Sequence, residues 1–168
     1  LLAGNSMIDF IAMMIICLVM AGANPANSSN LLNTAIFAGA MAGALMRFLR
    51  FNSYPARTFM GDVGSFFIGG ALVGMTMVTR LSLLLPIIAL AMFVSSLSDI
   101  IQIGYFKYTK KKYGEGRRIF RMAPLHHHYQ KDGIPALIKK PSGVLPEAKI
   151  VSRFWIVGII LAVITVAM

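Results

Sequence analysis

Five apolar runs separated by polar segments constrain the fold of this chain. They cover about residues 1–23, 31–49, 63–79, 81–105 and 150–168. A transmembrane helix needs roughly 20 apolar residues, within a range of about 17–25, to cross a hydrocarbon layer of about 30 Å. Each run falls close to this range, so we predict an all-α integral membrane protein with five transmembrane helices in this chain.

The composition supports the same class. Hydrophobic residues make up 57% of the chain and charged residues only 13%, and the mean hydropathy is +0.73. Soluble domains carry about 25% charged residues, so a water-soluble globular domain is excluded. The single cysteine, Cys17, lies within an apolar run and can form no disulfide within the chain.

The basic residues predict the orientation in the membrane. Fifteen of the 16 Lys and Arg residues fall around residues 47–57 and 107–153, and only Arg80 lies elsewhere. Because Lys and Arg accumulate in cytoplasmic loops, we expect cytoplasmic loops at 50–62 and 106–149. The net charge of +10 then indicates topology and attraction to anionic membrane lipids or phosphorylated ligands. No aromatic-interleaved basic domain supports nucleic-acid binding.

A polar segment, residues 52–65, leads into the third apolar run. Its carboxylate, Asp62, is expected at or near a helix N-terminus, where it could act as an N-cap. Alternatively, Asp62 could bind a hard cation such as Mg²⁺, which takes oxygen ligands and keeps water and substrate phosphates. The hydroxyl of Ser65 and the ring of Phe59, which could stack on a flat base, favour the binding site.

A second polar segment carries the consecutive residues His126, His127 and His128. They lack the i, i+4 spacing and the cysteine partners typical of zinc sites, which makes structural zinc an unfavoured alternative. A solvated loop is the other alternative. The interpretation that we favour is that the imidazoles lie beside a pyrophosphate group of a ligand. Among the nearby basic residues, Arg121 is the one we expect to touch a ligand.

Between these segments, Ser95, Asp99 and Gln102 are expected on one helix face, at i, i+4 and i+7. An ionisable residue in a membrane helix is a functional hypothesis. Asp99 could equally be solvated if the last turns of this helix project from the bilayer.

The chain resembles, over nearly its whole length, the C-terminal half of the phospho-N-acetylmuramoyl-pentapeptide transferases (MraY type), among the polyprenyl-phosphate N-acetylhexosamine-1-phosphate transferases. The matching stretches are residues 51–56, 59–65, 118–129 and 151–156. The three histidines, preceded by Met-Ala-Pro, resemble the peptidoglycan branch of this superfamily.

The resemblance implies a bundle of about ten helices at the cytoplasmic face of the bacterial inner membrane. It also implies Mg²⁺-dependent transfer of phospho-MurNAc-pentapeptide from UDP-MurNAc-pentapeptide to undecaprenyl phosphate, which forms lipid I and UMP. A homodimer and inhibition by nucleoside antibiotics are implied in the same way. The alternatives are a sister transferase that uses another UDP-sugar and a non-catalytic membrane scaffold or channel subunit.

The resemblance also implies residue roles. Asp62 would be the Mg²⁺ ligand, and the three histidines would be catalytic residues at the sugar-pyrophosphate end. Phe59 would stack on uracil, and Asn52 and Gln102 would make polar contacts in the nucleotide pocket. Ser65, Arg121 and Ala123 are the further residues that we predict to bind substrate.

Three departures from the family pattern accompany the resemblance. The paired aspartates and the Asp-Gly-x-Asp-Gly loop of the family would precede residue 1, so we expect the chain to be inactive without a missing N-terminal half. Ser95 stands where a Glu is expected, and Asp99, one turn later, could replace that charge. The segment 135–146 is longer than the usual link and is predicted to be a loop or a short segment lying on the membrane surface.

Overall fold

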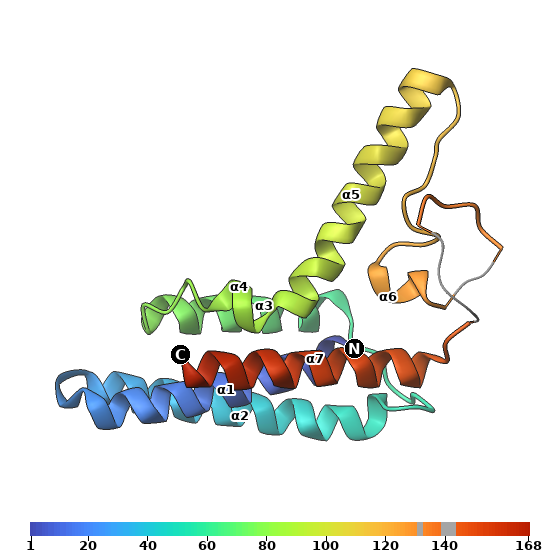
Figure 1. Ribbon diagram of the computed structural model, residues 1–168. Helices are drawn as coiled ribbons and strands as arrows, with labels where there is room; N and C mark the ends of the chain where they lie inside the picture. Colours follow the sequence, from blue (N-terminus) through green and yellow to red (C-terminus); the bar gives the residue numbers. More distant parts are fainter. Residues whose placement is uncertain (131–132, 139–143) are drawn as a thin grey trace. The chain divides into compact units, whose positions relative to one another are not determined.

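The computed structural model describes residues 1–130, 133–138 and 144–168 (Figure 1). The elements are α1 (Leu2–Ala23), the 3-10 helix η1 (Pro25–Asn27), α2 (Ser28–Asn52), α3 (Asp62–Val78), α4 (Leu85–Ile88), α5 (Leu90–Tyr113), α6 (Leu125–His128) and α7 (Glu147–Ala167). No strand occurs among these residues, which confirms the all-α prediction. The chain divides into two compact units, residues 1–91 with 154–168 and residues 92–153.

Three helical segments of the described chain are long and apolar enough to cross a membrane: α1, η1 together with α2, and α7. α3 is apolar but has only 17 residues. α5 carries Asp99, Gln102 and several lysines among its apolar residues. Of the five predicted spans, length and composition therefore support three.

Large apolar side chains remain exposed along these helices. Ile36 of α2, Phe66 of α3 and Val163 of α7 are 71%, 79% and 63% exposed. Soluble monomers rarely expose extensive apolar surface. The exposure agrees with helices that face lipid.

The continuous helix predicted over residues 81–105 is corrected by the structure. The chain turns after α3 at Arg80, whose φ is 59°, and the short α4 is separate from α5. Pro86 lies in the first turn of α4, where its missing N–H is tolerated. A longer helix through Pro86 would lose the hydrogen bond to Ser82 and place the proline ring against that carbonyl group.

Residues 106–113, predicted to begin a loop, are helical. α5 ends with Lys110, Lys111 and Lys112 in its last turn. Lysine is a good helix former, and its charge is favourable near a helix C-terminus. The chain leaves the helix at Gly114, whose φ of 77° is the left-handed conformation common after a helix.

α1 and α2 form the centre of the first unit. The buried residues of α2 recur at intervals of four and three, at Leu31, Ala35, Ala38, Ala42 and Leu45. This spacing places them on one helical face, and the small alanines let two helices approach closely. Residues along α2 therefore pack against α1 through a narrow apolar stripe.

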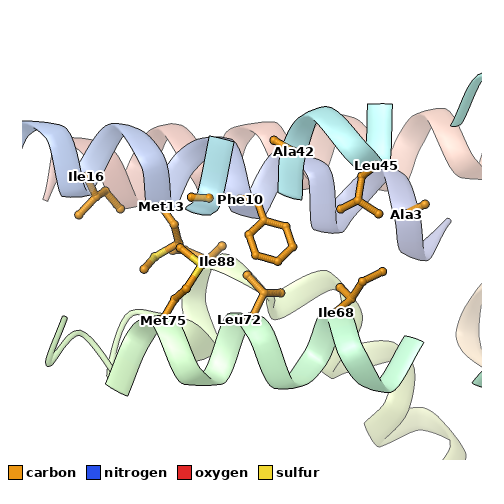
Figure 2. Close-up of a cluster of buried hydrophobic side chains, with 11 residues drawn as sticks. Ala3, Phe10, Met13, Ile16, Ala42, Leu45, Ile68, Leu72, Met75 and Ile88 are labelled. Atoms are coloured by element: carbon orange, nitrogen blue, oxygen red, sulfur yellow. The ribbon is translucent and has the colours of Figure 1, made fainter. Parts of the chain in front are cut away.

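The core of the first unit is completed by α3 and α4 (Figure 2). Ile68, Leu72 and Met75 lie on one face of α3 and point toward Phe10 and Met13 of α1. Phe10 is fully buried in this cluster. The packing fixes α3 in the first unit, and with it the position of Asp62 in the first turn of α3.

α7 packs against the start of α1. A Cβ atom on Gly4 would lie 2.1 Å from Nε1 of Trp155, and a Cβ atom on Gly158 would lie 3.5 Å from Oδ1 of Asn5. Only a glycine at position 4 leaves room for the indole ring. The two segments, distant in the sequence, are therefore joined by a close helix–helix contact.

Candidate active site

The first group of predicted site residues starts where α2 ends. Asn52 is the last residue of α2, and its Nδ2 donates a 2.8 Å hydrogen bond to the carbonyl of Thr58. The carbonyl of Phe51 accepts hydrogen bonds from the backbone N–H groups of Arg57 and Thr58, at 2.8 and 3.3 Å. Asn52 therefore closes the loop of residues 53–58, and its contact with a nucleotide stays a prediction.

Asp62 lies in the first turn of α3 with an exposed side chain. The N-cap position is occupied by Gly61 in extended conformation, and no side chain caps this helix. The N-cap alternative for Asp62 is therefore wrong. Its carboxylate lies at the positive end of the helix dipole without serving as the cap, and it is accessible to a ligand.

The neighbours of Asp62 differ in what they can offer a ligand. Phe59 is 81% exposed, so its ring is free to stack on a flat group. Ser65 is half-buried, and its hydroxyl donates a 2.9 Å hydrogen bond to the backbone carbonyl of Asp62. Phe59 and Asp62 are thus the two predicted site residues of this unit whose side chains are exposed.

The described residues fit a cation only as a partial site. Asp62 supplies one exposed carboxylate, but the described parts of the chain contain no group of three or more His, Cys, Asp or Glu that could hold a metal. Mg²⁺ is commonly held by one or two carboxylates together with water and substrate phosphates. Asp62 fits the role of one such ligand.

The second group of site residues lies in the second unit, along one face of α5. Gln102 Oε1 accepts hydrogen bonds from the N–H groups of Ile119 and Phe120, at 3.1 and 3.0 Å. Its Nε2 donates a 3.1 Å bond to the carbonyl of Phe120. Gln102 therefore holds the segment before the histidines, while its predicted contact with a nucleotide is untested.

Ser98 ties α6 to the same face of α5. Its hydroxyl accepts a 3.0 Å hydrogen bond from the N–H of Leu125, the first residue of α6, and donates to the carbonyl of Ser95. Both serines are buried. Because α6 has a single turn, this bond to its first N–H is a main determinant of where the histidines lie.

His128 is the most buried of the three histidines, at 3% exposure. Its Nδ1 accepts a 3.0 Å hydrogen bond from the N–H of Arg121. The rings of Phe120 and Tyr129 lie edge-on to its ring, with centroids 5.7 and 5.4 Å away. These contacts make His128 a positioning residue in this structure, because its Nδ1 must remain unprotonated to accept the bond.

His126 and His127 lie side by side, with ring centroids 4.2 Å apart. Nδ1 of His127 is 2.6 Å from Oε1 of Gln130. Burial lowers the pKa of His126 and the adjacent His127 lowers it further, while Asp99 and Glu147 act in the opposite direction. The neutral imidazole of His126 is therefore favoured, which suits a hydrogen-bonding partner better than a fixed cation.

Arg121 and Ala123 lie in the turn that leads into α6, and both are half-buried. The backbone of Arg121 is fixed by His128. The Ala123–Pro124 peptide bond is cis, directly before α6. Both residues belong to the same unit as the histidines, and their contacts with a substrate stay predictions.

The sequence analysis missed two residues that build this unit. Ser98 binds α6, and the hydroxyl of Thr109 accepts a 2.9 Å bond from the N–H of Arg117. Together with Ser95 and Gln102 they continue a spacing of three, four and seven residues along α5. That spacing is readable in the sequence, and it selects Ser98 rather than Asp99 for the buried face.

The predicted site residues fall in both units of the chain. Asn52, Phe59, Asp62 and Ser65 belong to the first unit. The second unit holds Gln102, Arg121, Ala123, His126, His127 and His128.

Of the segment 135–146, residues 139–143 lie outside the described part of the chain. The backbone of Leu137 and Ile138 binds the carbonyls of Arg118 and Ile119, at 3.0 and 3.1 Å.

Comparison with known proteins gives a consistent family relationship. Residues 1–80 match the family described as Glycosyl transferase family 4. The chain is 56% identical over 134 residues to a phospho-N-acetylmuramoyl-pentapeptide-transferase of Parabacteroides distasonis, which covers 78% of this chain and 32% of that protein.

Two further relatives with the same name match almost the whole chain. The protein of Azobacteroides pseudotrichonymphae is 43% identical, covering 99% of this chain and 42% of its own length. The protein of Desulfosudis oleivorans is 43% identical, covering 99% of this chain and 44% of its own length. The chain thus spans less than half the length of these relatives, and the resemblance to this family is confirmed.

Proposed function

Because this chain belongs to the family of the phospho-N-acetylmuramoyl-pentapeptide transferases, we propose that it forms part of the enzyme that makes lipid I. The reaction transfers phospho-MurNAc-pentapeptide from UDP-MurNAc-pentapeptide to undecaprenyl phosphate and releases UMP. The observation that carries the proposal is 43% identity over 99% of the chain to relatives of that name. The enzyme would act in the bacterial inner membrane, with the loops that carry Asp62 and the histidines on the cytoplasmic side.

In this proposal, Asp62 provides one ligand for Mg²⁺. When bound, the cation would neutralise charge on the phosphates of the substrate. The support is the exposed carboxylate in the first turn of α3, which is not used as a cap. The exposed ring of Phe59, three residues earlier, would stack on the uracil base.

The second unit would bind the sugar-pyrophosphate group of the substrate. Phosphoryl transfer depends mainly on positioning and on stabilising charge, so a rigid frame is valuable. Gln102 and Ser98 hold the chain on both sides of the turn before α6. His126, favoured in its neutral form, and His127 would then bind the sugar-pyrophosphate group by hydrogen bonds, with Arg121 contributing positive charge.

The test is Mg²⁺-dependent release of UMP by the full-length parent protein, comparing wild type with Asp62→Asn. Loss of a metal ligand removes several kcal/mol of charge stabilisation, so we expect activity to fall by at least about 100-fold. Glu115→Gln is the matched control, because Glu115 is also an exposed carboxylate but belongs to none of the predicted sites. It should keep near-wild-type activity.

Three outcomes would contradict parts of the proposal. Near-wild-type activity of a folded Asp62→Asn protein would remove Asp62 from the metal site. UMP release with another UDP-sugar but not with UDP-MurNAc-pentapeptide would identify a sister transferase. A wild-type protein that releases no UMP from any UDP-sugar would favour a scaffold or channel subunit.

A further inference from the structure

A basic pocket lies at the end of α2, within the first unit. Its volume is about 440 Å³, in the range of small-molecule binding sites. It is lined by Arg47, Arg50, Phe51, Ser53, Tyr54, Pro55 and Arg57. Three guanidinium groups and two aromatic rings thus line one hollow. Residues 51–56 belong to one of the matching stretches, but none of the three arginines has been given a specific ligand.

The local fold brings the three arginines together. Arg47, Arg50 and Phe51 are three and four residues apart, so they share one face of the last turns of α2. The guanidinium of Arg47 lies over the ring of Phe51, with Cζ 5.3 Å from the ring centroid. The backbone hydrogen bond from Arg57 to the Phe51 carbonyl folds the loop back, which adds the third arginine.

The electrostatics of the pocket favour an anion. None of the described residues that line it carries a carboxylate, and Arg47, Arg50 and Arg57 are all exposed. The helix-end carbonyls of Leu49 and Phe51 are occupied by backbone N–H groups, which reduces their repulsion of an anion. Guanidinium groups bind phosphate oxygens in a bidentate manner, and three of them suit one phosphate group with its bridging oxygens.

The position of the pocket favours a lipid as the source of that phosphate. Residues 25–52 are long and apolar enough to cross a membrane, and the pocket lies at the last turn of this span, at the level expected for headgroups. Tyr54 is 88% exposed beside it, and tyrosine is enriched at the membrane–water interface. Anionic lipids attract basic residues at such sites.

We propose that Arg47, Arg50 and Arg57 form a binding site for the phosphate headgroup of an anionic phospholipid at the end of α2. The phosphodiester lies among the guanidinium groups, and Phe51 and Tyr54 contact the glycerol and the first acyl carbons. The inference does not rest on the proposed transferase reaction. It gives the membrane a direct contact with the loop that leads into α3 and Asp62.

The test uses the full-length parent protein and native mass spectrometry with added phosphatidylglycerol. The variant is the triple substitution Arg47→Gln, Arg50→Gln, Arg57→Gln. The matched control is Lys107→Gln, Lys110→Gln, Lys111→Gln, which removes the same charge from exposed lysines of α5. We expect the arginine variant to bind phosphatidylglycerol at least about tenfold more weakly than wild type, because each basic residue adds measurably to the attraction of anionic lipid. The affinity of the lysine variant for phosphatidylglycerol should change by less than about twofold.

Two further probes separate the possible sources of the phosphate. Phosphatidylcholine should bind more weakly than phosphatidylglycerol to wild type, and soluble glycerol 3-phosphate should not displace phosphatidylglycerol. The proposal is overturned by equal losses in the two triple variants, by equal binding of the two lipids, or by a site that takes glycerol 3-phosphate and not the lipid. If the triple variant does not fold, Arg57→Gln alone must still weaken lipid binding, and unchanged binding would overturn the site.

Discussion

Replacing Gln102 with leucine should release the segment that leads into the histidines. In the structure the side-chain amide of Gln102 forms three hydrogen bonds with the backbone of Ile119 and Phe120. Leucine is similar in size but can form none of them. The substitution therefore removes the polar contacts with little change in volume.

The magnitude follows from those three bonds. A typical intramolecular hydrogen bond contributes about 0.5–1.5 kcal/mol, and a buried group left unsatisfied costs more. Gln102 is only half-buried, so water can replace part of what is lost. We therefore expect a local loss of about 2 kcal/mol, which corresponds to roughly 30-fold faster opening of this segment at 1.4 kcal/mol per factor of ten.

The assay is amide hydrogen exchange of the full-length protein, measured on peptides that contain Ile119 and Phe120. Both N–H groups donate to Oε1 of Gln102, so their protection reports directly on this side chain. Gln102→Glu is the informative control, because it keeps an oxygen acceptor for the two N–H groups, although it replaces the Nε2 donor with an oxygen and adds a negative charge. Its protection should remain much closer to wild type than that of the leucine variant.

Unchanged protection of Ile119 and Phe120 in Gln102→Leu would refute the reasoning. So would equal loss of protection in the leucine and glutamate variants, since the acceptor would then not matter. Faster exchange over the whole protein would indicate general unfolding rather than release of the segment.

Two further predictions concern packing and protonation. Gly4→Ala should lower the unfolding free energy in detergent by about 1–3 kcal/mol, because a Cβ atom there would meet the Trp155 indole. Gly22→Ala is the control and should leave the unfolding free energy unchanged, because a Cβ atom at Gly22 meets nothing within 4 Å. Equal thermal stability of the two variants would contradict the contact between Gly4 and Trp155. His126 should titrate below pH 6.5 in an NMR titration, because burial and His127 lower its pKa. Because the pKa of His126 is lowered by folding, the contribution of His126 to stability is present above pH 6.5 and is lost as the pH falls through and below that value. A measured pKa of His126 at or above 6.5 would contradict the prediction.

Most of the helices could be predicted from the sequence, because their determinants are local. Apolar runs of sufficient length indicated α1, α2, α3 and α7, and the first turn of α3 fell at Asp62 as expected. The break at Pro86 and the extension of α5 to Tyr113 were not predicted. Both depend on local chemistry, proline geometry and lysine helix propensity, which hydrophobicity alone does not report.

The candidate site divides in the same way. The motifs and the exposed residues Phe59 and Asp62 were identified from the sequence, since a motif in a loop needs no distant partner to be visible. The hydrogen bonds of Gln102, Ser98 and His128 were not predicted from the sequence. Their backbone partners lie up to 27 residues away and are determined by tertiary packing. A polar side chain on an apolar helix can face a ligand or another backbone segment.

The sequence alone therefore determined the membrane class, most helices and the family, because apolar length, charge distribution and motifs are properties of contiguous residues. Tertiary structure alone decided which polar side chains form hydrogen bonds with the backbone of another segment and which remain accessible to a ligand. It also brought together Arg47, Arg50 and Arg57, which lie three to ten residues apart in the sequence, around one pocket at the end of α2. The physical reason is that hydrogen-bond and charge partners are selected by distance in space, which the order of residues does not specify.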